Sequence, residues 1–181
     1  VRRVASVVVV AACHSGPPTP DGAIVASNVG PQQMVTDGTY LYWTDFRSGI
    51  LKTPLDARDA QPMSVVSSTI AMQPQALAID ATSIYWSNAG DQFANNGSIM
   101  KVDLAGGTPT TLLGNTFGPP PNWMAIDATH LYFTTESGVW SIPKSGGLLR
   151  ELASNETEAE EIVVAGSHLY WTDIALHAIR S

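Results

Sequence analysis

The chain has 181 residues, of which 44% are hydrophobic and 14% charged, and this composition predicts one packed globular domain. Nine basic residues stand against 16 acidic ones, giving a net charge of −7, which argues against general binding to nucleic acids. The single cysteine excludes a disulfide framework and a cysteine-rich zinc site, and no hydrophobic run is long enough to cross a bilayer as a helix.

The first 12 residues have the layout of a secretory signal peptide. Two arginines precede an uninterrupted run of Val, Ala and Ser over residues 4–12, and Cys13 follows directly. The segment Val-Val-Ala-Ala-Cys that ends at Cys13 resembles the lipobox of bacterial lipoproteins, although Val10 stands where leucine is commonest. This resemblance implies that residues 1–12 are removed and that Cys13 becomes the lipid-modified first residue. The alternative is a buried β-strand followed by an ordinary core cysteine.

The segment after the signal, residues 13–22, is rich in Pro, Gly and Ser and predicts an extended tether. The lipoprotein resemblance implies export across the inner membrane and anchoring at the cell envelope through the lipid. His14 follows the cysteine, whereas an aspartate there favours retention in the inner membrane. We therefore expect the outer membrane as the destination where the source has one.

The rest of the chain consists of four similar segments with matched tyrosines at Tyr42, Tyr85, Tyr132 and Tyr170. They recur about every 40 residues, which is the length of one blade of a β-propeller. Each segment divides into short β-strands separated by turn residues, so the sequence predicts blades of four antiparallel strands. The predicted blades cover residues 31–68, 74–114, 121–153 and 159–181. Residues 23–28 are expected to form a spare outer strand.

The motif Leu-Tyr-Trp-Thr-Asp occurs twice, ending at Asp45 and Asp173, and degenerate copies end at Asn88 and Thr135. It resembles the YWTD repeat of propellers of the low-density-lipoprotein-receptor type, and of bacterial secreted lipoproteins with similar repeats. The resemblance implies an all-β propeller in which the recurring Tyr, Trp and Asp residues build the blades. Because known rings of this family have six blades, the resemblance favours a fragment of a longer ring. The alternative is a four-bladed ring closed by the N-terminal strand.

The loops between the second and third strands, together with those between blades, gather on one face of a propeller and predict a ligand site. The longest, residues 89–96, combines an aromatic ring with amides and a carboxylate, which suits a sugar or peptide. The candidate ligand-binding residues are Phe46, Arg47, Asp91, Phe93, Asn95 and Trp123. The alternative for residues 89–96 is a solvated loop with turn chemistry. For Trp123 it is a packing role.

The sequence contains no motif typical of catalysis, metal binding or cofactor binding. Asp37, Asp80 and Asp127 recur in register, but each precedes turn residues, so we expect them to cap hairpins rather than form a metal ring. Four glutamates within residues 156–161 lack the spacing of a calcium loop and predict a solvated acidic turn.

These observations favour a non-catalytic, lipid-anchored propeller with a binding or scaffold role at the cell envelope. We expect a protein, peptide or carbohydrate ligand on the loop face, and neither a cofactor nor a metal. The alternative is a metal-dependent propeller enzyme of the lactonase or lyase type, which needs several acidic, amide or imidazole side chains converging on the central channel. The first strand of each repeat instead supplies mostly Met, Val, Ala and Ile.

Overall fold

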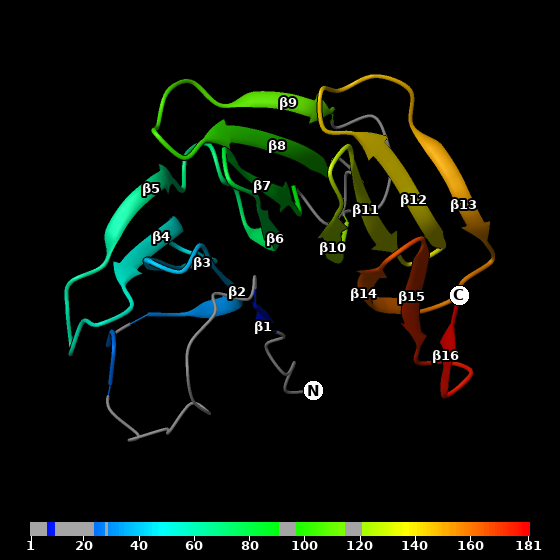
Figure 1. The fold of residues 1–181 in the computed structure, drawn as a ribbon, viewed down its shortest axis with the longest axis horizontal. Helices are drawn as coiled ribbons and strands as arrows, with labels where there is room; N and C mark the ends of the chain where they lie inside the picture. Colours follow the sequence, from blue (N-terminus) through cyan, green and yellow to red (C-terminus); the bar gives the residue numbers. More distant parts are fainter. Residues whose placement is uncertain (1–6, 10–23, 28, 91–96, 115–120) are drawn as a thin grey trace.

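The computed structural model describes residues 7–9, 24–27, 29–90, 97–114 and 121–181. Strands account for all the regular structure in these ranges, and none of the described residues forms a helix that could cross a membrane. The strands form four sheets, one for each repeat (Figure 1). The all-β class predicted from the sequence is confirmed.

Each repeat folds into a blade whose antiparallel strands follow chain order from the propeller axis outward. Blade A contains β2 (Pro31–Thr36), β3 (Tyr40–Asp45), β4 (Gly49–Pro54) and β5 (Met63–Ser67). Blade B contains β6 (Pro74–Ile79), β7 (Ser83–Asn88), β8 (Ser98–Asp103) and β9 (Thr110–Leu113). Blade C contains β10 (Trp123–Ile126), β11 (His130–Thr135), β12 (Gly138–Pro143) and β13 (Arg150–Ser154). Blade D contains β14 (Ala159–Ala165), β15 (His168–Asp173) and β16 (Ala178–Arg180).

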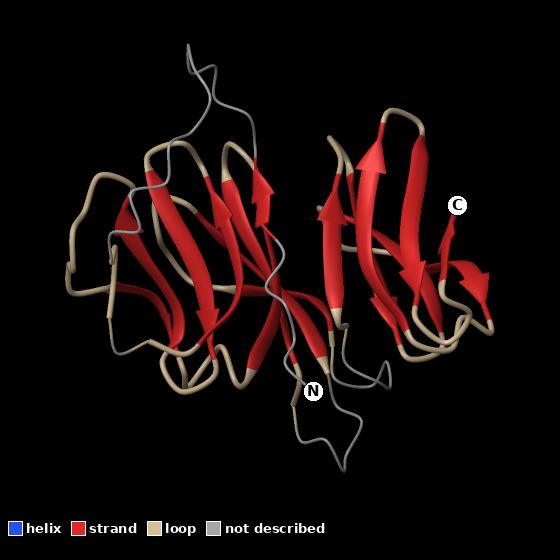
Figure 2. Cartoon of the chain, turned by 90° about the horizontal axis from the view of Figure 1, so that it is seen from below, coloured by secondary structure: helices blue, strands red, loops and turns tan. Residues whose placement is uncertain are grey.

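The innermost strands β2, β6, β10 and β14 contact one another in this order around a common axis (Figures 1 and 2). Blades A and D therefore stand at the two ends of the series, and Figure 1 shows an opening between them. The arrangement is a four-blade β-propeller, as the repeat predicts.

Two N-terminal segments lie beside blade A. Strand β1 (Val7–Val9) pairs in parallel with β2, and Val7 lies opposite Met34. Residues 24–27 belong to no strand, and the carbonyl oxygens of Ile24 and Val25 accept hydrogen bonds from the backbone of Asp59 and Ala60, at 2.7 and 3.1 Å. The described part of the expected spare strand therefore runs along the loop after β4 and not along β16 of blade D.

Neighbouring blades pack through opposite faces of their second strands. Alternation along the strand puts the tyrosine of the motif on one face, called here the Tyr face, and the tryptophan on the other, called the Trp face. Tyr42 of blade A lies in one buried cluster with Leu77 and Trp86 of blade B. The same pairing joins Tyr85 to Phe133 between blades B and C. Each blade thus presents its Tyr face to the Trp face of the next.

The fourth residue of the motif adds a hydrogen bond between consecutive blades. The hydroxyl of Thr44 donates to the carbonyl oxygen of Gln75 at 3.0 Å. In the same way, Ser87 donates to Pro121 at 2.9 Å, and Thr134 to Glu160 at 2.8 Å. The side chains of Thr44, Ser87 and Thr134 are fully buried, so these bonds replace contacts with water at the blade interfaces.

Candidate functional site

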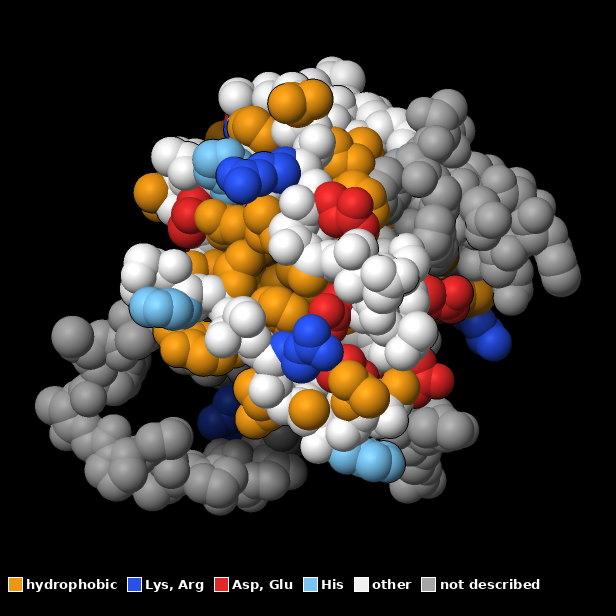
Figure 3. All heavy atoms as spheres, turned by 90° about the vertical axis from the view of Figure 1, so that its right-hand side faces the viewer, with side chains coloured by type: hydrophobic (Ala, Val, Ile, Leu, Met, Phe, Trp, Pro, Cys, Tyr) orange, Lys and Arg blue, Asp and Glu red, His pale blue; other side chains and the backbone are white. Residues whose placement is uncertain are grey.

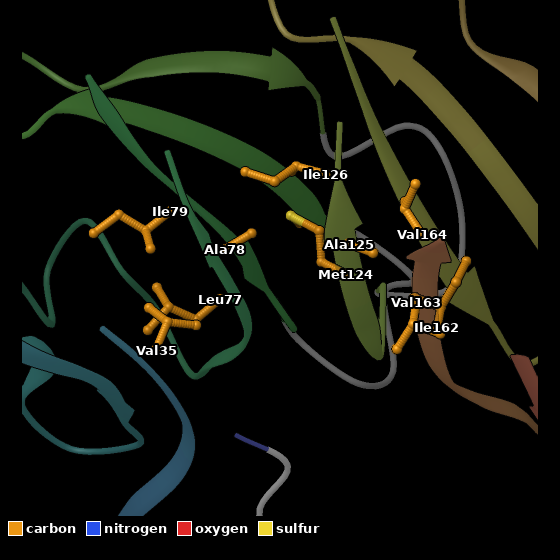
Figure 4. Close-up of a pocket in the computed structure, with 10 residues that line it drawn as sticks. All are labelled: Val35, Leu77, Ala78, Ile79, Met124, Ala125, Ile126, Ile162, Val163 and Val164. Carbon is orange, nitrogen blue, oxygen red and sulfur yellow. The ribbon is translucent and has the colours of Figure 1, made fainter. Parts of the chain in front are cut away.

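A cavity of about 240 Å³ lies on the propeller axis, between the innermost strands of all four blades (Figure 4). Its walls are made of aliphatic and methionine side chains: Val35, Leu77, Ala78, Ile79, Met124, Ala125, Ile126, Ile162, Val163 and Val164. The hydrophobic channel expected from the first strand of each repeat is therefore present. Such a lining offers neither metal ligands nor a general acid or base.

The three recurring aspartates lie on the hairpins that join the first two strands of blades A, B and C. In each, Oδ1 accepts hydrogen bonds from two backbone amides of the turn; for Asp127 these come from Thr129 and His130, both at 2.7 Å. In each, Oδ2 accepts the hydroxyl of the motif tyrosine, at 2.9 Å for Tyr42, 3.0 Å for Tyr85 and 2.7 Å for Tyr132. The predicted capping role is confirmed.

Asp80 has an additional partner that the sequence did not predict. The ammonium group of Lys144, in the next blade, lies 2.5 Å from Oδ2 of Asp80 and also donates to the carbonyl oxygen of Asp127 at 3.1 Å. Burial tends to raise the pKa of Asp80, but the hydrogen bonds from Lys144, Thr82 and Tyr85 outweigh it and lower the pKa below its usual range. Burial, followed by the contact with Asp80, raises the pKa of Tyr85 to about 12.

No three His, Cys, Asp or Glu side chains within the described ranges are grouped so that they could hold a metal ion. The aspartates of the hairpins are spread over three blades, and the hydrogen bonds described above occupy both oxygens of each. These carboxylates therefore stabilise turns, and that of Asp80 also joins two neighbouring blades.

The candidate residues Phe46 and Arg47 lie together on the turn between β3 and β4, at the end of blade A that carries the loop face. Asp45 shapes this turn, since its side chain accepts hydrogen bonds from the amides of Gly30 at 2.6 Å, Arg47 at 3.0 Å and Ser48 at 2.9 Å. Partial burial acts to raise the pKa of Asp45, but these bonds lower it below its usual value. Phe46 is 52% exposed and Arg47 is also exposed, so an ordered turn presents both to solvent.

Trp123 lies two blades away from Phe46, at the start of β10. It is partly buried and packs against the cluster between blades C and D, which contains Ile162 and Trp171. Its position agrees with the packing role that the sequence left open. Cys13, Asp91, Phe93 and Asn95 lie outside the described residues.

The acidic turn before blade D differs from the sequence prediction at Glu156. This side chain is 3% exposed; it accepts a hydrogen bond from the indole of Trp171 at 2.9 Å and pairs with Arg180 at 3.0 Å. The prediction of a solvated turn is wrong for Glu156, because partners 15 and 24 residues away in the sequence enclose it. Glu158 and Glu161 are exposed as expected.

No protein-family model and no curated protein matches the chain. Among solved structures, it is similar to a chain in a nidogen/laminin complex, with a TM-score of 0.75 and 21% identity over 92% of this chain and 63% of that one. The similarity to a gluconolactonase from Xanthomonas campestris has a TM-score of 0.62 and 14% identity, over 82% of this chain and 56% of that one. The computationally designed protein Ika4 has a TM-score of 0.65 and 8% identity, over 86% of this chain and 91% of that one. The chain thus spans less than two thirds of the first two. These likenesses show a β-propeller fold.

Proposed function

We propose that this chain is a non-catalytic β-propeller with a binding or scaffold role at the bacterial cell envelope. The observation that carries this proposal is the chemistry of the axis, where the cavity is walled by aliphatic and methionine side chains. Propeller enzymes of the metal-dependent type need several ligands converging there. The recurring aspartates of this chain instead cap hairpins at the edge of the blades.

The ligand site of this proposal is the loop face, with Phe46 and Arg47 as its described contacts. An exposed aromatic ring beside a guanidinium group on one ordered turn suits a protein, peptide or carbohydrate surface. A protein partner is supported by the similarity to a propeller chain that was solved in a complex of nidogen and laminin. The proposal also includes Asp91, Phe93 and Asn95, on their chemistry in the sequence, and Trp123, the partly buried residue at the start of β10.

A photo-crosslinking residue in place of Phe46 tests this face in living cells. We expect a crosslinked product that Arg47→Glu abolishes. The matched control carries the crosslinker at Leu148, which is 85% exposed on the hairpin after β12, at the opposite end of the blades. Equal products from both positions would contradict a specific loop-face ligand.

The proposal includes membrane attachment through Cys13 and a location at the envelope, in the outer membrane where the source has one. Its support is the signal-like segment 1–12 and the lipobox pattern that ends at the only cysteine. Metabolic labelling with an alkynyl fatty acid should mark the protein, and Cys13→Ser should remove both the label and the attachment to membranes. Unchanged labelling of the serine variant would refute the anchor.

The interpretation as part of a longer ring is supported by the 63% of the nidogen/laminin chain that this chain covers. The alternative of a metal-dependent lactonase or lyase is supported by the likeness to a gluconolactonase. Calorimetric titration with Ca²⁺ and Mn²⁺, followed by a lactone hydrolysis assay, distinguishes a binding propeller from a metal-dependent enzyme. A binding propeller should show neither tight metal binding nor turnover.

A further inference from the structure

Among the described residues, no blade packs on the Tyr face of blade D. Val163, Tyr170 and Ile179 are 45%, 38% and 78% exposed, whereas Val35 and Tyr42, at the positions of Val163 and Tyr170 in blade A, are 1% and 2% exposed. Val163 lies opposite Tyr170, and Thr172 lies opposite Ile179, so the four side chains form one continuous surface. Figure 3 shows hydrophobic side chains gathered on the side of the molecule where blades C and D lie.

Among the described residues, no blade precedes blade A; Ile24, Val25, Ala26 and Val29 instead lie over part of its Trp face, and Trp43 is 2% exposed. A crevice of about 310 Å³ opens there, walled by hydrophobic side chains that include Ile24, Val29, Met34, Leu41 and Trp43. The start of β2, before the part that pairs with β1, is also uncovered: Pro31 and Gln32 are exposed, although the residues at the position of Pro31 in the other blades (Pro74, Pro121 and Ala159) are all buried.

These two surfaces are the halves of an interface that the chain already builds three times. At each internal junction, a Tyr face packs on a Trp face, and a motif hydroxyl donates to a carbonyl at the start of the next inner strand. Thr172 occupies the position of Thr44 and Thr134 in the repeat, and Gln32 occupies that of Gln75, which accepts from Thr44. Blade D therefore carries the donor half and blade A the acceptor half.

We propose that the Tyr face of blade D binds the Trp face of blade A in a second copy of this chain. Tyr170 and Ile179 enter the crevice beside Trp43, and the hydroxyl of Thr172 donates to the carbonyl oxygen of Gln32. A second copy is the occupant we propose, because it supplies the same type of Trp face that covers the Tyr faces of blades A, B and C. In a longer ring, a further blade of the same chain would take this place instead. The contact joins two different surfaces, so association is head to tail.

Sedimentation velocity over a wide range of concentrations tests the contact. The full chain is used with Cys13→Ser, so that no acyl chain drives association. We expect this parent to associate. Ile179→Asp in blade D and Ile24→Asp beside the crevice should each weaken association by at least about tenfold, because a charge must then be buried. The matched control is Leu148→Asp, which adds the same charge at an exposed residue outside both surfaces and should leave association unchanged.

Mixing the two defective variants identifies the geometry. The Ile24→Asp variant keeps an intact blade D and the Ile179→Asp variant an intact blade A, so the mixture should regain one contact and form a one-to-one complex. A dimer formed through two blade D faces would associate equally well with and without Ile24→Asp. That result, a monomeric parent, or a mixture of folded variants without a complex would overturn the proposal. If near-UV circular dichroism shows that Ile179→Asp is unfolded, Val163→Asp replaces it.

Discussion

The hydroxyl groups between blades give the sharpest test of how the propeller is held together. The side chain of Thr44 is fully buried; it accepts the backbone amide of Gln33 at 3.1 Å and donates to the carbonyl oxygen of Gln75 at 3.0 Å. Thr44→Val keeps the shape of the side chain but removes both hydrogen bonds. Each buried main-chain group left without a partner costs about 1–3 kcal/mol. We therefore expect Thr44→Val to lower the free energy of unfolding by about 2–4 kcal/mol.

The repeat supplies two matched controls for this substitution. Thr134 is also fully buried and donates to Glu160 at 2.8 Å, so Thr134→Val should cost about 1–2 kcal/mol. Thr172 is half-buried at the end of the series, and its hydroxyl forms no hydrogen bond within the described part of the chain. Thr172→Val should therefore change stability by less than about 0.5 kcal/mol.

Urea unfolding followed by tryptophan fluorescence measures all three variants. The measurements are made in the Ile24→Asp background, because association would otherwise add to the stability of the parent and because Ile179 lies directly opposite Thr172. The order of losses should be Thr44→Val, then Thr134→Val, then Thr172→Val. Equal losses at Thr44 and Thr172 would refute the reasoning, because the cost would then come from the strand itself and not from the junction between blades.

Two further predictions concern the hairpins. Burial acts to raise the pKa of Asp127, but hydrogen bonds from Thr129, His130 and Tyr132 lower it from 3.8 to about 2. The contribution of Asp127 to stability is therefore complete above pH 3.8 and is lost as the pH falls toward 2. In acid unfolding followed by circular dichroism, Asp127→Asn should make stability less dependent on pH in this range. Gly49→Ala would place a Cβ atom 2.2 Å from the carbonyl oxygen of Val66 at a φ of +95°, and it should cost at least about 3 kcal/mol or prevent folding. Gly106→Ala has a similar φ of +90° with no atom within 4 Å, so calorimetry should show a loss of only about 1 kcal/mol.

The blades could be predicted from the sequence because their residues repeat in register. The second strand of blade A spans Tyr40–Asp45, and the equivalent strands start at the matched residues of the other blades. A pattern that recurs four times fixes both the strand and the side chains on each face. The capping role of Asp37, Asp80 and Asp127 followed for the same reason, since turn chemistry is local.

Contacts between distant residues were beyond such a pattern. Lys144 takes the position that Leu104 has in blade B, so the repeat gives no sign that it pairs with Asp80 across a blade junction. Glu156 stands among other glutamates, and only the fold brings Trp171 and Arg180 to it. For the loop face, the sequence predicted that Phe46 and Arg47 lie on a turn. The hydrogen bond from the amide of Gly30 to the side chain of Asp45, which helps to order this turn, depends on the fold.

The positions of the carboxylates separate the two functional hypotheses. In blades A, B and C, the hairpin aspartates are occupied by turn amides and tyrosine hydroxyls, and Asp80 also binds Lys144. A metal ion at any of these sites would have to compete with three or more hydrogen bonds, and at Asp80 also with the positive charge of Lys144. The catalytic alternative therefore has to draw its ligands from the loop face, where Asp91 is a candidate of the right type. We expect metal binding and lactone hydrolysis to stay at background level both in the parent and in Asp91→Asn, and we expect Arg47→Glu to abolish crosslinking at Phe46. Together these results would mean that the loop face serves binding and not catalysis.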